Sequence, residues 1–136
     1  MDGTGPIMAS ETEKITINLG PIDLGQIDLL VQEGFYSNRT DFIRTAIRNQ
    51  LATHAEAVRQ AVTRKTLMIG LQRYTSQDLE AVRAAGQRLQ IRVLGLASIA
   101  DDVSPELALA TIDSINVLGA FHASEEVKRA LAERIR

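Results

Sequence analysis

The sequence predicts an α+β protein in two parts: a short strand followed by two helices, and then a small α/β domain made of a repeated strand-turn-helix unit. Residues 14–19 alternate strictly between polar and apolar side chains, and two helical patterns follow them directly. Glycines at 70, 95 and 119 then recur at intervals of 25 and 24 residues. We therefore expect a flexible tail over residues 1–12, the strand-helix-helix part over 13–52, a helical extension or linker over 53–65, and the repeat domain over 66–136.

The strand is expected to have one buried and one exposed face, because successive side chains of a strand point to opposite sides. The apolar face holds Ile15, Ile17 and Leu19. The polar face holds Lys14, Thr16 and Asn18. Gly20 and Pro21 end the strand.

Two helices follow the strand. The first has apolar residues on one side at helical spacing: Leu24, Ile27, Leu30 and Val31. Gly34 is expected to end it, because a left-handed residue commonly follows a helix. Ser37 or Asn38 can cap the second helix. The apolar side of that helix carries Phe42, Ile43, Ala46, Ile47 and Leu51.

Three such short elements cannot enclose a core alone, and a single strand leaves two unpaired edges. A two-fold dimer solves both problems, because two copies of the strand pair antiparallel and four helices cover their apolar face. The predicted dimer core consists of Ile15, Ile17, Leu19, Ile43 and Ile47. The opposite face of the ribbon then displays Lys14, Thr16 and Asn18 twice, and a two-stranded ribbon fits the major groove of B-DNA.

Residues 14–51 resemble the ribbon-helix-helix family of bacterial DNA-binding proteins. The resemblance depends on the strand at 14–19, the Gly34 turn and the segment Ser37-Asn-Arg-Thr-Asp-Phe-Ile-Arg44. The last segment is similar to the start of the second helix in the metal-responsive branch typified by the nickel repressor. The resemblance implies that Lys14, Thr16 and Asn18 contact bases. It also implies that the start of the second helix, with Ser37, Asn38 and Arg39, holds DNA phosphates.

Charge is distributed unevenly along the chain. The formal net charge is -2. Residues 14–65 carry seven basic and five acidic side chains, and the first thirteen residues carry three acids and no base. The basic excess is small, so specificity would depend on the ribbon and on helix ends rather than on bulk charge.

The second half contains three similar units. Short apolar runs at 66–71, 91–96 and 115–120 each contain one of the repeated glycines. Each run is followed by a helix that can begin at Ser76, Ser104 or Ser124. The last helix is expected to hold Val127, Leu131 and Ile135 on its apolar side. We interpret the three units as parallel strands stacked in a small solenoid, with an ordinary α/β domain as the alternative.

Catalytic and cofactor chemistry are not indicated. The chain has no cysteine and two histidines, His54 and His122, so thiolate sites are excluded. The histidine and cysteine cluster of the nickel-responsive relatives is missing, so their metal sensing does not carry over. We expect no enzyme activity, no cofactor and no metal.

The leading hypothesis is a sequence-specific DNA-binding dimer that represses transcription, with double-stranded DNA and a second copy as partners. The C-terminal domain would serve assembly, or bind a protein partner or a small effector. Antitoxins of the family, which bind their own promoter and a toxin, are a variant. The alternative is a protein-interaction or polymer-forming module in which the strand-helix-helix part is a dimerising clasp. The absence of cysteine, of an apolar run of about 18 residues and of signal-peptide features predicts a cytoplasmic protein without a membrane span. The DNA-binding hypothesis adds the expectation that it is associated with the nucleoid.

Overall fold

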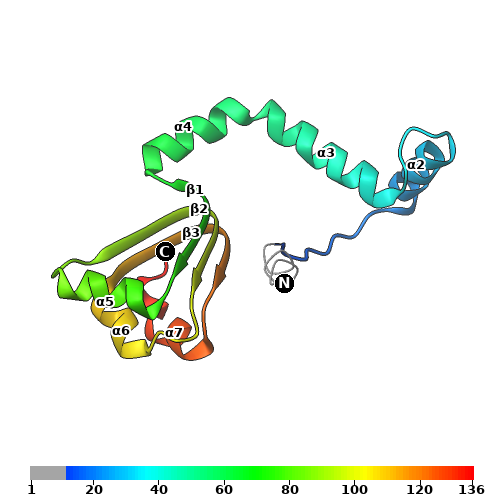
Figure 1. Ribbon diagram of the computed structural model, residues 1–136. Helices are drawn as coiled ribbons and strands as arrows, with labels where there is room; N and C mark the ends of the chain where they lie inside the picture. Colours follow the sequence, from blue (N-terminus) through cyan, green and yellow to red (C-terminus); the bar gives the residue numbers. More distant parts are fainter. Residues whose placement is uncertain (1–11) are drawn as a thin grey trace, which may run out of the picture. The chain divides into compact units, whose positions relative to one another are not determined.

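A computed structural model describes residues 12–136, which form two compact units, Thr12–Ala61 and Val62–Arg136 (Figure 1). The expected tail at 1–12 lies almost entirely outside the described residues. Each unit is described separately below. The described chain has no helix that is both long and apolar enough to cross a bilayer.

The N-terminal unit contains helices α2 (Pro21–Gln32) and α3 (Arg39–Thr53). Pro21 suits the first position of α2, where its missing N–H has no intrahelical acceptor anyway. Gly34 has φ 87°, and the Phe35 N–H donates to the Leu30 carbonyl at 3.0 Å. This closes α2 in the manner of a Schellman motif, so the predicted role of Gly34 is correct. The cap of α3 is Asn38, one of the two expected residues.

The predicted strand at Lys14–Leu19 is not formed in the single chain, where residues 12–20 have no regular secondary structure. The physical reason is that a strand is defined by hydrogen bonds to a neighbour. No other described segment of the N-terminal unit is extended, so one chain offers the strand no partner.

The second helix of the N-terminal unit does not continue without a break. It ends at Thr53, and α4 (Ala55–Lys65) begins after His54. The Thr53 hydroxyl donates to the Asn49 carbonyl at 3.1 Å. A hydroxyl bonded to the carbonyl four residues earlier slightly destabilises and bends a helix, which favours the break at His54. Helix α4 spans the boundary that separates the two units at Ala61 and Val62. The described boundary therefore lies four residues before the expected start of the repeat domain at 66.

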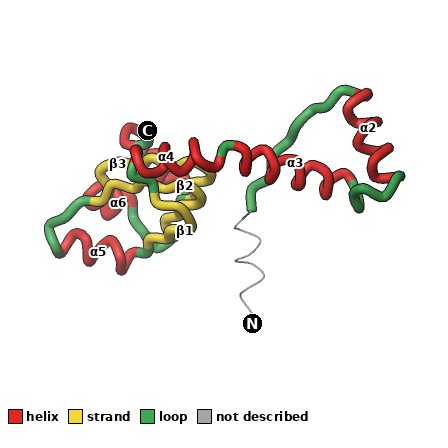
Figure 2. Tube along the Cα trace, turned by 90° about the horizontal axis from the view of Figure 1, so that it is seen from above, coloured by secondary structure: helices red, strands yellow, loops and turns green. Residues whose placement is uncertain are grey.

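The C-terminal unit is a three-stranded parallel sheet with helices packed on it (Figures 1 and 2). Its strands are β1 (Met68–Tyr74), β2 (Leu89–Ile99) and β3 (Ile112–His122), in the order β1-β2-β3. Its helices are α5 (Ser76–Ala84), α6 (Pro105–Thr111) and α7 (Glu125–Ala130). Each strand is thus followed by a helix, and β2 and β3 extend well beyond the apolar runs that predicted them.

Side-chain caps start all three helices of this unit. Thr75, rather than Ser76, caps α5, and it forms a capping box with Asp78. Ser104 caps α6 and Ser124 caps α7, each by accepting the N–H three residues later. The predicted caps are thus correct for α6 and α7, and one residue late for α5.

The core of the C-terminal unit lies between one face of the sheet and the three helices. Its fully buried large side chains come from every layer: Leu79, Ile91, Val93, Ile112, Ile115, Val127 and Leu131. Buried Thr111 satisfies its hydroxyl by donating to the Leu107 carbonyl at 2.7 Å. The core is aliphatic, as expected from the low aromatic content of 4%.

Ile135 does not lie on the last helix, so that part of the prediction is wrong. Helix α7 ends at Ala130, and the 3-10 turn η1 (Ala132–Arg134) redirects the chain. Ile135 then forms a parallel bridge with Ile115 of β3, and the Arg136 N–H donates to the Ile115 carbonyl at 2.7 Å. The last two residues thus occupy some of the backbone hydrogen-bonding groups on the outer edge of β3.

Candidate nucleic-acid interface

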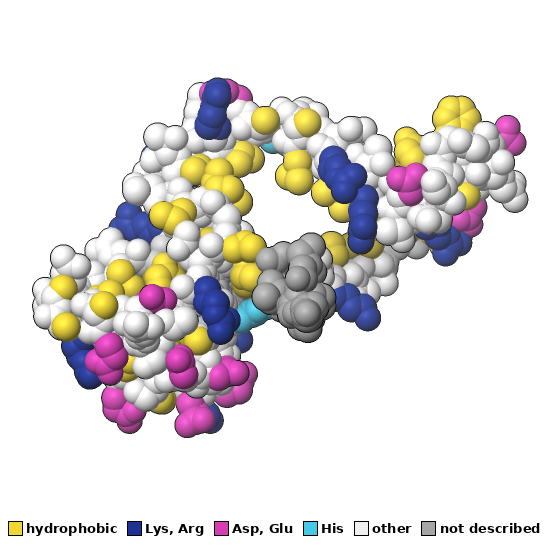
Figure 3. All heavy atoms as spheres, viewed as in Figure 1, with side chains coloured by type: hydrophobic (Ala, Val, Ile, Leu, Met, Phe, Trp, Pro, Cys, Tyr) yellow, Lys and Arg dark blue, Asp and Glu magenta, His cyan; other side chains and the backbone are white. Residues whose placement is uncertain are grey.

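An apolar groove dominates the N-terminal unit. It has a volume of about 890 Å³ and is lined from the extended segment, α2 and α3. All five residues expected in a dimer core line it: Ile15, Ile17, Leu19, Ile43 and Ile47. Ile27, which also lines the groove, is buried. Hydrophobic side chains are visible on the surface of both units (Figure 3).

The groove is incompletely covered in the single chain. Ile15 is 75% exposed, Ile17 57% and Ile47 46%. Large aliphatic side chains gathered at one exposed site indicate a surface that binds another protein surface. Ile15 and Ile17 belong to the segment that forms no strand in the single chain. Association with another chain could therefore bury these side chains and also supply the missing strand partner.

The polar side chains of residues 14–19 lie outside this groove. Lys14, Thr16 and Asn18 are exposed, and none of them lines it. The alternation seen in the sequence is therefore maintained in space, although no strand is formed.

The start of α3 is a tight arrangement of polar groups. The Asn38 side chain accepts the Asp41 N–H at 2.8 Å, and the Asp41 carboxylate accepts the Ser37 N–H at 2.9 Å. The backbone N–H groups of Arg39 and Thr40 have no acceptor within the helix, because they belong to its first turn. The helix dipole makes this end positive, although Asp41 offsets part of that charge.

Arg39 is bound to Asp28 of α2. Its Nε and Nη2 atoms donate to the two carboxylate oxygens, each at 2.8 Å. Hydrogen bonding and charge attraction from Arg39 lower the pKa of Asp28, and the same contacts raise the pKa of Arg39. The bidentate pair links α2 to α3, and sequence reasoning missed it because the two residues are eleven positions apart.

Three features lie together in the N-terminal unit: an extended segment at 14–19 that forms no strand, an exposed aliphatic groove and a polar helix start. The chain matches the Ribbon-Helix-Helix transcriptional regulator family over residues 10–128. It belongs to this family. The resemblance seen in the sequence covered only residues 14–51, whereas the family match continues through β1, β2 and β3 into α7. Neither the curated proteins nor the solved structures gave a match.

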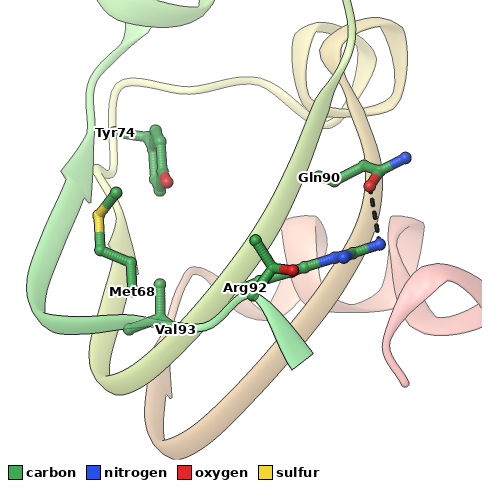
Figure 4. A pocket seen from close by; sticks show the side chains of 6 residues that line it. Met68, Tyr74, Gln90, Arg92 and Val93 are labelled. Carbon is green, nitrogen blue, oxygen red and sulfur yellow. Dashed lines mark hydrogen bonds between the residues drawn. The ribbon is translucent and has the colours of Figure 1, made fainter. Parts of the chain in front are cut away.

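The C-terminal unit of this ribbon-helix-helix protein has a smaller hollow of about 250 Å³ beside β1. Figure 4 shows Met68, Tyr74 and Val93 near it, with Arg92 donating to Gln90 at 2.9 Å. Partial burial raises the pKa of the Tyr74 hydroxyl. The lining contains one cation, Arg92, and no carboxylate. Residues 12–136 contain no group of three or more His, Cys, Asp or Glu side chains arranged to hold a metal.

Proposed function

We propose that this chain is a sequence-specific DNA-binding regulator that acts as a ribbon-helix-helix dimer and represses transcription. The observation that supports this most strongly is the segregation of the extended segment. Its aliphatic side chains line the groove, whereas Lys14, Thr16 and Asn18 remain outside it and exposed. A second copy placed on the groove would pair the two segments and leave the polar residues on the outer face.

Dimerisation would be driven by apolar burial. Ile15, Ile17 and Ile47 of each chain are substantially exposed before association. Fully burying an aliphatic side chain of this size contributes about 1.5–3 kcal/mol. Six such side chains per dimer, together with the new ribbon hydrogen bonds, give association a strong driving force that offsets the ordering of the segment.

The proposed ribbon places three polar side chains per strand in the major groove. Asn18 can donate to and accept from one adenine edge, Thr16 can bond several bases, and Lys14 can reach a guanine edge or a phosphate. These groups differ in hydrogen-bonding pattern, so the ribbon can distinguish sequences rather than merely attract DNA.

The start of α3 is the proposed phosphate clamp. Ser37, Asn38 and the free amides of the first turn can approach a phosphate beside the ribbon. Arg39 is an additional cation there, but its guanidinium is shared with Asp28. Phosphates are the same at every base step, so this clamp would fix position and not sequence.

The operator is first located in the DNA upstream of the gene. The experiment then compares the affinity of the protein for this operator with its affinity for a scrambled duplex. Asn18→Ala and Thr16→Ala should each lower the ratio of operator to scrambled affinity. Each lost base contact should cost about 1–3 kcal/mol of binding free energy on the operator. Ser37→Ala should weaken both duplexes alike. Gln32→Ala, an exposed amide at the end of α2, is the control and should change neither.

An unchanged ratio in both ribbon variants would reject the ribbon as the reader. The chain would then be better described as an interaction module with a dimerising clasp. For the C-terminal unit, the three parallel strands with glycines in one register favour a short solenoid that serves assembly or binds a partner.

A further inference from the structure

The two edges of the C-terminal sheet differ. At the β3 edge, the Ile135 bridge and the Arg136 hydrogen bond occupy part of the backbone. At the other edge, β1 pairs with β2 on one side, and no described residue pairs with it on the other. Its residues include no proline and no lysine, which are common protections of an exposed edge.

Three glycines in register form a row across the sheet, and this row ends at the same edge. Gly70, Gly95 and Gly119 are in register and have φ of 135°, 140° and 126°. A Cβ on Gly95 or Gly119 would collide with the carbonyl of the preceding glycine in the row, whereas a Cβ on Gly70 would meet nothing. Gly70 therefore has the backbone of an interior member of the row but no neighbour on its open side.

The sheet face away from the helices carries two aliphatic rows beside the glycines. Ile69 is in register with Leu94 and Leu118, and Leu71 with Leu96 and Ala120. Ile69 is 66% exposed and Leu71 55%, so both rows end at β1 with open side chains. A strand added beside β1 would cover these ends and continue the rows.

We propose that β1 pairs antiparallel with β1 of a second copy, in a register centred on Gly70, to form a continuous six-stranded sheet. In this register Ile69 lies opposite Leu71 of the other chain. Arg73, the only charged residue of β1, falls beyond the start of the partner's strand, at the level of Leu67, so no like charges of the two strands face each other. A two-fold axis at Gly70 makes the contact self-complementary.

The choice of a second copy as occupant rests on the proposed function. A dimer held by its N-terminal ribbons brings two β1 edges into one molecule. Tethering then makes their pairing an intramolecular event at high effective concentration. The continuous sheet would make the C-terminal units part of the dimer interface.

The chain has no cysteine, so disulfide trapping can test the register without a background. Ile69→Cys with Leu71→Cys places two thiols directly opposite each other across the proposed pair, where close cross-strand positions suit a disulfide. Leu118→Cys with Ala120→Cys has the same spacing on β3 and is the matched control. Ile69→Cys alone tests for random collision. We expect most of the first variant, and little of the other two, to migrate as a cross-linked pair of chains under mild oxidation.

Equal cross-linking of all three variants, or none in the first, would overturn the proposal. Circular dichroism of each variant verifies that it is folded, which is expected because Ile69, Leu71 and Leu118 are exposed and Ala120 is only partly buried. A gel shift on the same samples separates this inference from the proposed function. DNA binding without cross-linking rejects only the β1 contact. Cross-linking without DNA binding rejects only the proposed function as a DNA-binding regulator.

Discussion

The carbonyl oxygen of Gly70 occupies the space that a Cβ atom on Gly95 would require. The same relationship holds between Gly95 and Gly119 one strand further on. Both downstream glycines also have φ values that side-chain-bearing residues rarely adopt. The period of the repeat thus has a steric basis, because close strand approach at one register excludes every residue except glycine.

Gly95→Ala is expected to destabilise the C-terminal unit by about 4 kcal/mol or more, because it adds a backbone collision to conformational strain. Gly70→Ala is the matched control. It has nearly the same φ, and a Cβ there meets no atom of its own chain, so within one C-terminal unit only the strain of about 1–3 kcal/mol applies. Thermal unfolding of the two variants, followed by circular dichroism, gives the comparison. Equal loss in both would show that strain alone, and not contact with Gly70, requires glycine at position 95.

The C-terminal unit should fold without the N-terminal unit. The buried residues of its core cluster lie between Leu79 and Leu131, and the helices and strands that pack together belong to the same unit. A chain beginning at Val62 should show mixed helix and strand. Its unfolding midpoint should lie within about 5 °C of that of the full protein, a shift that roughly 1 kcal/mol produces in a domain of this size. Loss of cooperative unfolding in the shortened chain would mean that the two units depend on each other.

Sequence reasoning succeeded where the signal is local. The cap at Asn38, the turn at Gly34 and the caps at Ser104 and Ser124 each depend on a few neighbouring residues. The glycine spacing anticipated strands that prove to be parallel and in register, because a fixed period brings equivalent positions together.

The remaining features depend on contacts between distant residues or between chains. The Asp28–Arg39 pair and the bridge from Ile135 to Ile115 have no local pattern. The segment at 14–19 has a clear strand pattern but no strand, because its hydrogen-bonding partner is absent from one chain. The strand pattern therefore predicts that this segment pairs as a strand in a dimer. The base contacts of Lys14, Thr16 and Asn18 stay predictions, because they depend on that pairing.

Ile17→Asp should abolish dimerisation. Ile17 lines the aliphatic groove, and burying an unpaired carboxylate there costs several kcal/mol for each of the two chains. Sedimentation velocity should show a single-chain species, and binding to the operator should be lost with it. Ile22→Asp is the control, because Ile22 is 76% exposed on α2 and does not line the groove. An Ile17 variant that remains a dimer and still binds the operator would remove the groove from the interface.

Lys14→Ala should reduce the salt dependence of DNA binding. Each phosphate neutralised contributes about 0.9 to the slope of log affinity against log salt, and a dimer presents two lysines. The slope should therefore decrease by up to about 1.8 when both lysines contact phosphates. An unchanged slope with weaker operator binding would place Lys14 on a base edge instead.

The ion pair between Asp28 and Arg39 should limit the DNA affinity of the wild-type protein. Because the pKa of Asp28 is lowered in the folded chain, the pair is fully formed above the ordinary aspartate value of 3.8. It is lost only as pH falls through the lowered folded value. DNA binding between pH 6 and pH 8 should therefore not depend on titration of this pair.

Asp28→Asn should release the guanidinium of Arg39 toward the DNA backbone. The neutral amide keeps the shape of the carboxylate but not its charge, so a phosphate becomes the better partner. The expected result is tighter binding to operator and scrambled DNA alike, with a salt slope steeper by up to about 1.8 for the two arginines of a dimer. Asp28→Asn combined with Arg39→Ala should lose the gain, which assigns it to Arg39. Glu33→Gln makes the same charge change just past the end of α2 and should leave the slope nearly unaltered. If Asp28→Asn folds normally but does not steepen the slope, Arg39 does not reach a phosphate, and its function is to hold α2 against α3.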